Sequence, residues 1–213
     1  RQDLIESFKV FLYFFQYPGG HIKPHEVEKF ISEGIRFKPA QYILKLLEYA
    51  ERIEGKRIGV TKAEITHCVF NDLRCTRDNE DVANVWKRIK ENRENNVDYD
   101  WTGDVIRYAG DILDYMEIAN LLVSHGNNFY INCLERQAVY KFISSTNWFA
   151  DYDSMIASRT PDWNQIKKAQ SNWFDYVNTK VDSKFFETDI LAFISSNEEE
   201  YEKLKQASLS LLE

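Results

Sequence analysis

The stretch TGDVIRYAGDILDYMEIANLLVSHGNNFYINCLERQAVYKFI, residues 102–143, decides the fold. Its first half carries apolar residues at helical spacing, which predicts a long amphipathic helix. Gly126 and the asparagines that follow it tolerate the positive φ angles of a tight hairpin, and LERQAVYKFI predicts a returning helix. A helix, a β-hairpin wing and a second helix are the parts of a winged-helix module. Such modules dock on duplex DNA or join proteins together, so both functions stay open at this point.

The composition indicates a folded, mainly helical protein. Of the 213 residues, 44% are hydrophobic and 15% aromatic, which is enough to bury a core, and only 8 are Gly and 4 Pro. The formal net charge is −7, so no overall field attracts the chain to nucleic acid, and DNA contact would need a local basic patch. No stretch approaches the ~20 apolar residues of a membrane helix. The three cysteines form no CxxC pair, so we expect reduced thiols in a cytosolic protein.

The chain divides by pattern into three predicted regions. Residues 1–95 are predicted to be helical and to contain a helix-turn-helix over residues 61–94. Residues 96–146 form the winged-helix unit, and residues 147–213 form a helical linker that leads to a missing C-terminal domain. Helices in this last region are predicted near residues 162–178, 187–195 and 198–212. The predicted fold class is therefore mainly α, with winged-helix and helix-turn-helix modules and a small β-hairpin wing.

No catalytic site is predicted within the chain. Pro161 with Asp162, and Asp182 with Lys184, formally match the PD…(D/E)xK pattern of Mg²⁺-dependent nucleases, in which two carboxylates hold the metal. The pattern places its second element on a buried strand, and no β-rich run precedes Asp182. A possible zinc set of His67, Cys68 and Cys75 has the spacing of neither a finger nor a ribbon, so core packing is the simpler interpretation and no metal site is predicted.

Three groups of side chains are candidates for contact with DNA. Arginines and lysines gather in the segment 74–93 and could meet phosphates or a guanine edge, but acids lie among them, so an exposed helix stabilised by ion pairs is an equal alternative. The polar hairpin tip could touch a groove, although turn preference alone also explains its Gly and Asn. A Thr-x-x-Glu capping box at residues 61–64 could present a helix N-terminus to a phosphate. The candidate residues are Thr61, Lys62, Arg74, Arg77, Lys87, Arg88, Ser124, His125, Asn127 and Asn128.

Three blocks of the chain resemble the recognition region of type IIS restriction and nicking endonucleases of the AlwI-like family. They are FLYFFQYPGG at 11–20, FKPAQYILKLLEYAERIEGKRIGVTKAEITHCVF at 37–70 and DVIRYAGDILDYMEIANLLVSHGNNFYIN at 104–132, in the same order as in that family. The resemblance implies a modular bacterial or archaeal cytoplasmic enzyme. Its winged-helix portion would recognise a short asymmetric site in double-stranded DNA. A separate PD-(D/E)xK domain, or a second nuclease subunit, would cut at a distance with Mg²⁺.

The chain departs from that family's pattern at two places. Residues 118–120 lack the Thr-Gly that usually precedes the wing, and the segment 98–117 is acidic, so its outer face should turn away from a phosphate backbone. The acidic segment and the net charge keep open an alternative function, a winged-helix scaffold for protein–protein interaction without DNA binding. Sequence-specific recognition of double-stranded DNA is the function we expect.

Overall fold

The computed structural model describes residues 2–99 and 105–180. The chain divides into a compact unit of residues 1–182 and a second unit of residues 183–213. The second unit lies outside the described residues, and so do the helices predicted near 187–195 and 198–212. Within the described part of the chain, no helix is long and apolar enough to cross a membrane.

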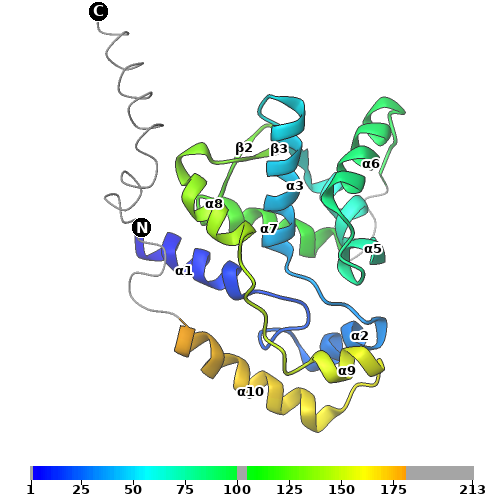
Figure 1. The fold of residues 1–213 in the computed structure, drawn as a ribbon, viewed down its shortest axis with the longest axis vertical. Helices are drawn as coiled ribbons and strands as arrows, with labels where there is room; N and C mark the ends of the chain where they lie inside the picture. The colour runs from blue at the N-terminus through cyan, green and yellow to red at the C-terminus, as the bar shows by residue number, and fades with distance from the viewer. Residues whose placement is uncertain (1, 100–104, 181–213) are drawn as a thin grey trace, which may run out of the picture. The chain divides into compact units, whose positions relative to one another are not determined.

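The first unit combines helices with one small sheet (Figure 1). The helices are α1 (Gln2–Phe14), α2 (Pro24–Glu33), α3 (Pro39–Glu54), α4 (Lys62–Ile65), α5 (Leu73–Thr76), α6 (Val82–Glu94), α7 (Val105–Ile118), α8 (Arg136–Ile143), α9 (Asp153–Ser158) and α10 (Trp163–Lys180). The strands are β1 (Gly59–Thr61), β2 (Leu122–His125) and β3 (Asn128–Ile131). A π-helical turn, η1 (Thr66–Phe70), follows α4, and a 3-10 turn, η2 (Cys133–Glu135), precedes α8.

Local sequence signals set the ends of several helices. Pro24 and Pro39 each lie in the first helical turn, where the missing N–H has no partner to lose. Gly34 and Gly55 end α2 and α3 in the left-handed conformation, with φ of 75° and 63°. These four positions explain why the boundaries of α2 and α3 follow from the sequence.

α3 lies in the middle of the core, and the sheet completes a winged helix. Four of its side chains, Ile43, Leu44, Leu46 and Leu47, are fully buried, and it packs against α1, α6, α7 and α8. The predicted hairpin is confirmed, because β2 and β3 pair antiparallel with Leu122 opposite Ile131. The other edge of β3 pairs with β1, so the sheet order is β1-β3-β2. The succession α3, β1, α4, α7, β2, β3 is that of a winged helix and confirms the predicted fold class.

The structure places the domain boundaries differently from the sequence prediction. β1 belongs to the predicted region 1–95 but pairs with a strand of the region 96–146, so the boundary at 95/96 runs through one sheet. Residues 147–180 are packed and do not form a free linker, because α9 and α10 contact α2. In addition, the backbone N–H of Phe149 donates to the Gln16 side chain at 2.9 Å. Strand pairing and burial thus outweigh the polar composition that suggested the boundaries.

The helix-turn-helix pair also differs from the predicted one. The predicted second helix, α6, packs on α3 and η1, whereas α7 contacts both α4 and η1. α5 and α6 are therefore inserted between the second and third helices of the winged helix, and α7 takes the position directly before the wing. Gly59 lies in β1, where an added Cβ would approach the ring of Tyr130 to 2.7 Å.

Candidate nucleic-acid interface

The wing presents a polar and exposed tip. Ser124, His125 and Asn127 are exposed around the turn that Gly126 forms with a φ of 58°. The Ser124 hydroxyl donates to the Glu117 carboxylate of α7 at 2.5 Å, and Asn128 lies opposite Thr61 in the sheet. Ser124 and Asn128 therefore have structural roles, and His125 and Asn127 are the wing residues best placed to contact a partner.

Thr61 and Lys62 form the junction between β1 and α4. The Thr61 hydroxyl accepts from Glu64 N at 3.2 Å and the Glu64 carboxylate accepts from Thr61 N at 2.8 Å, so the predicted capping box is confirmed. Lys62 Nζ lies 2.7 Å from the Asp114 carboxylate on α7. The Thr61 side chain already accepts from the Glu64 amide, and Lys62 is paired with Asp114. The N-terminus of this four-residue helix therefore has few groups left to bind a phosphate.

Neighbouring acids neutralise the basic cluster at 74–93. Arg88, whose side chain is 21% exposed, lies 3.1 Å from Asp72 and 2.8 Å from Glu80. The other pairs join Arg74 with Asp72, Arg77 with Asp78, Lys87 with Glu91, Lys90 with Glu54 and Arg93 with Glu64. Lys87 is the most loosely held of these cations, 3.8 Å from Glu91 and 76% exposed. The segment thus matches the ion-pair alternative, and contact of its residues with DNA stays a prediction.

The space between Asp72, Cys75 and Glu80 holds an arginine. Their potential ligand atoms lie within 4.8 Å of one another, but the Arg88 guanidinium pairs with both carboxylates and donates to the Cys68 carbonyl at 3.2 Å. Burial raises the pKa of the Cys75 thiol to about 11, so this thiol is protonated at neutral pH, whereas zinc binds the thiolate. These contacts favour core packing over a metal site here.

Only the first part of the formal nuclease pattern, Pro161 with Asp162, lies among the described residues. Asp162 accepts a hydrogen bond from Gln165 N at 2.8 Å and so caps the first turn of α10. Asp182 and Lys184 lie outside the described residues. Asp162 thus has a structural role at a helix end.

Sequence patterns did not single out a second set of cations, on α3 and the turn that follows it. Lys45 is half-buried, and Arg52, Lys56 and Arg57 are exposed. No described carboxylate forms an ion pair with any of these four. Two of the nearby acids are engaged elsewhere, since Glu51 pairs with Arg136 and Glu54 with Lys90, and Glu48 remains beside Lys45 and Arg52. The positive charge of the four cations is therefore not cancelled by an ion pair with a described carboxylate.

A basic cleft of about 390 Å³ opens at the N-terminal end of α3. Its lining includes Arg36, Lys38, Lys45 and Arg77, one carboxylate from Asp78, and the Trp148 ring. Burial, together with the nearby charge of Lys45, lowers the pKa of Lys38 to about 8. Burial is the larger cause, and an anion bound in the cleft would offset the smaller contribution, which is the repulsion by Lys45. Arg77 is the one candidate residue from the sequence that lies here.

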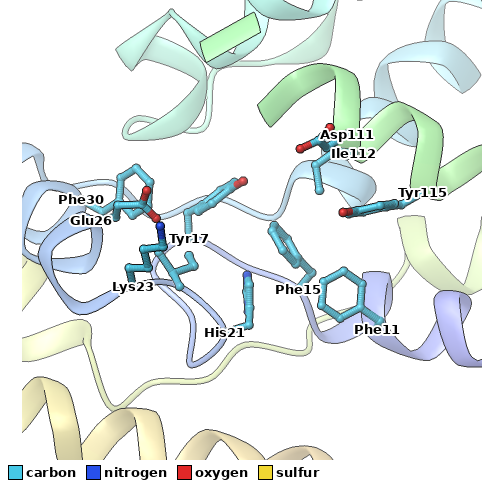
Figure 2. A pocket seen from close by; sticks show the side chains of 11 residues that line it. Phe11, Phe15, Tyr17, His21, Lys23, Glu26, Phe30, Asp111, Ile112 and Tyr115 are labelled. Atoms are coloured by element: carbon cyan, nitrogen blue, oxygen red, sulfur yellow. The ribbon is translucent and has the colours of Figure 1, made fainter. Parts of the chain in front are cut away.

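A larger cavity, about 490 Å³, is chemically different (Figure 2). Aromatic rings from α1, the α1–α2 loop, α2 and α7 line most of it. His21 packs 4.0 Å from the ring centre of Phe15, and desolvation lowers its pKa, so the imidazole is neutral at neutral pH. The charged residues of the lining are Lys23, Glu26 and Asp111. Because carboxylates outnumber cations, this cavity is unsuited to a phosphate and we assign it no DNA contact.

Comparison with known proteins decides the family. The family described as "Restriction endonuclease BpuJI - N terminal" matches residues 1–174 of the chain. The chain belongs to this family. A solved structure described as "Crystal structure of pyrene- and phenanthrene-modified DNA in complex with the BpuJ1 endonuclease binding domain" has a similar fold, with a TM-score of 0.61 and 20% sequence identity. The similarity covers 79% of this chain and 64% of that chain. No curated protein matches the chain.

Membership of the BpuJI N-terminal family confirms the restriction-endonuclease resemblance at that level. The narrower resemblance to AlwI-like enzymes stays a prediction. The net charge of the chain is −7, so any positive charge that it presents at its surface has to be gathered locally. The cleft and the unpaired cations of α3 are where the described structure offers it.

Proposed function

We propose that this chain recognises a short sequence of double-stranded DNA as the recognition part of a type IIS restriction or nicking endonuclease. The observation that carries the proposal is the basic cleft, whose lining has four cations and one carboxylate in an acidic chain. Arg77 pairs with Asp78 and Arg36 with Asp153, whereas no described carboxylate forms an ion pair with Lys38 or Lys45. A cleft of this kind binds phosphates and releases their counterions, which is the main source of affinity for DNA. Membership of the BpuJI family supports the same function, and so does a fold similar to that of a DNA-bound domain.

The recognition of sequence would come from the wing. His125 and Asn127 carry side chains that hydrogen-bond to base edges, and both are exposed at the hairpin tip. Hydrolysis would belong to a PD-(D/E)xK domain or subunit outside the described residues, which would use Mg²⁺ as its cofactor. The enzyme would act on DNA in the cytoplasm of a bacterium or archaeon, and a relationship to AlwI-like enzymes is part of this proposal.

The experiment is a selection of duplexes from a randomised pool by the purified chain, followed by a salt titration with a selected duplex. We expect enrichment of one short motif and a log–log salt slope of about 0.9 for each phosphate contacted. Arg36→Ala, which removes an exposed cation from the basic cleft, should weaken binding, and Lys29→Ala on α2 is the matched control.

One result would overturn the proposal in favour of the alternative function. If the folded chain binds no duplex even at low salt, the winged helix serves as a scaffold for protein–protein interaction instead. The acidic α7 and the net charge of −7 favour that alternative.

A further inference from the structure

A second basic cleft, of about 400 Å³, lies at the C-terminal end of α3. Its lining includes Arg52, Lys56, Arg57 and Arg136, with Glu48 and Glu51. Arg57 donates to the Ile131 carbonyl at 3.3 Å and lies 4.9 Å from the Tyr130 ring centre. Arg52 lies 5.3 Å from the ring centre of Tyr49. Rings and a carbonyl thus hold these two guanidinium groups in place without cancelling their charge.

The two clefts share one side of α3. Gln41 and Lys45 line the first cleft, and Glu48 and Arg52 line the second. Their spacing of four, three and four residues returns to the same side of a helix at each step. Since α3 has 16 residues, the two ends are about 24 Å apart.

α8 runs beside α3 and is fixed to it at both ends. The Gln41 amide donates to the carbonyl oxygens of Phe142 and Ser145, at 3.0 and 2.7 Å. At the other end, Arg136 lies 2.5 Å from Glu51. The side of α3 between the clefts is therefore bordered by α8, while α6 packs on the helix as well (Figure 1).

α7, the helix before the wing, carries negative charge, in contrast to the two basic clefts of α3. Asp111, Asp114 and Glu117 recur every three residues along α7, on one side of the helix. Asp114 pairs with Lys62, and Glu117 accepts from Ser124, so these acids also brace the junction with β1 and the wing. An acidic helix repels a phosphate backbone, which makes α7 a poor element to lay against one.

We infer that the DNA backbone lies along α3, with one phosphate in each of the two basic clefts. We call the residues that would line this path, Arg36, Lys45, Arg52, Lys56 and Arg57, the α3 track. The inference rests on the proposed DNA-binding function and adds which surface makes the backbone contact. Glu48 lies between Lys45 and Arg52 on the same side of the helix, so its carboxylate weakens the contact and limits non-specific affinity.

The test uses the full chain and a short fluorescein-labelled duplex of mixed sequence, with binding followed by fluorescence anisotropy over a range of salt concentrations. Lys45→Ala with Arg52→Ala should lower the log–log salt slope by about two units and weaken binding at low salt on the order of a hundredfold. Lys45→Arg with Arg52→Lys keeps both charges and should bind like the parent chain. Glu48→Gln should strengthen binding severalfold.

Matched variants elsewhere separate this inference from the proposed function. Lys29→Ala removes an exposed cation of α2, away from both clefts, and should leave the salt slope unchanged. If Lys45→Ala with Arg52→Ala binds as the parent does while His125→Ala or Lys87→Ala loses binding, the backbone lies elsewhere and the α3 track is overturned, although DNA recognition stands. If the parent chain binds no duplex at all, the proposed function fails first. Far-ultraviolet circular dichroism of each variant identifies any loss of binding caused by unfolding.

Discussion

Arg93 and Glu64 join α6 to the first turn of α4, with Nε of the arginine 2.6 Å from Oε1 of the glutamate. The Glu64 side chain is 6% exposed, and its other oxygen accepts from Thr61 N at 2.8 Å. We expect Arg93→Ala to destabilise the fold by about 2 kcal/mol, less than for a fully buried pair because the Arg93 side chain is 38% exposed. Urea denaturation measures the change. Arg93→Lys should restore part of the loss, and an unchanged midpoint for Arg93→Ala would show that solvent compensates Glu64.

Arg88 and Lys87 are adjacent in the sequence, but their replacement by alanine should change stability by very different amounts. Arg88→Ala leaves Glu80 without its cation and Asp72 with Arg74 alone, so we expect a loss of about 3 kcal/mol in the free energy of unfolding. Lys87→Ala should change stability by less than about 0.5 kcal/mol, because its side chain is 76% exposed. Thermal unfolding distinguishes the two, and equal effects would mean that the Arg88 pairs contribute nothing measurable.

Two glycines should respond with opposite sign to replacement by alanine. At Gly59 a Cβ would come within 2.7 Å of the Tyr130 ring and 2.9 Å of Asn128 Cβ, so Gly59→Ala should cost about 1–3 kcal/mol by separating β1 from β3. At Gly110, within α7, the nearest atom is Lys62 Cδ at 3.7 Å, so Gly110→Ala should stabilise the helix by up to about 1 kcal/mol. Denaturant titration checks both, and a neutral Gly59→Ala would show that the sheet yields freely.

Lys38 should make DNA binding depend on pH near pH 8. Burial and the charge of Lys45 lower its pKa to about 8, whereas an unperturbed lysine titrates near ~10.4. The charged form prevails below pH 8 and is lost as the pH rises through it, so affinity for a duplex should fall between about pH 7 and 9. Binding at constant ionic strength measures the effect. Lys38→Arg keeps its charge over that range and should remove the dependence, and a parent profile as flat as that of the variant would contradict the prediction.

The wing tip should affect sequence preference without affecting stability. His125 and Asn127 are exposed, so alanine at either position should change the free energy of unfolding by less than about 0.5 kcal/mol. If they contact base edges, each replacement should cost about 1–3 kcal/mol of discrimination between the selected motif and mixed sequence. Competition binding between the two duplexes measures this. Equal loss of affinity for both duplexes would assign the wing to the backbone instead.

Local chemistry explains which parts of the fold were predictable. The ends of α2 and α3 follow from proline and glycine, and the start of α4 follows from the Thr61 and Glu64 capping box, because each signal acts within one turn of helix. β1 was not predicted, since a three-residue strand has too little pattern and exists only through its pairing with β3. The same pairing explains why the region boundary at 95/96 does not separate compact units.

The candidate interface was harder to predict, because the sequence does not show which acidic and basic side chains form ion pairs in the folded protein. Arg88 reaches Glu80 across eight positions, outside the usual three- and four-residue spacing of helical ion pairs. Glu54 lies two residues before Lys56 in the sequence but pairs with Lys90 of α6. Tertiary packing thus neutralises the segment that looked most basic and leaves charge on α3, where alternating acids hid it.

The position of β3 between β1 and β2 has a consequence for synthesis of the chain. Translation releases residues 59–61 long before the hairpin with which they pair, so they cannot join a sheet while α4, α5, α6 and α7 are being made. Only when Ile131 has left the ribosome tunnel can both edges of the middle strand be filled. The hairpin that presents His125 and Asn127 is therefore also the last part of the sheet to be made, and a truncated chain that stops before it lacks the sheet altogether.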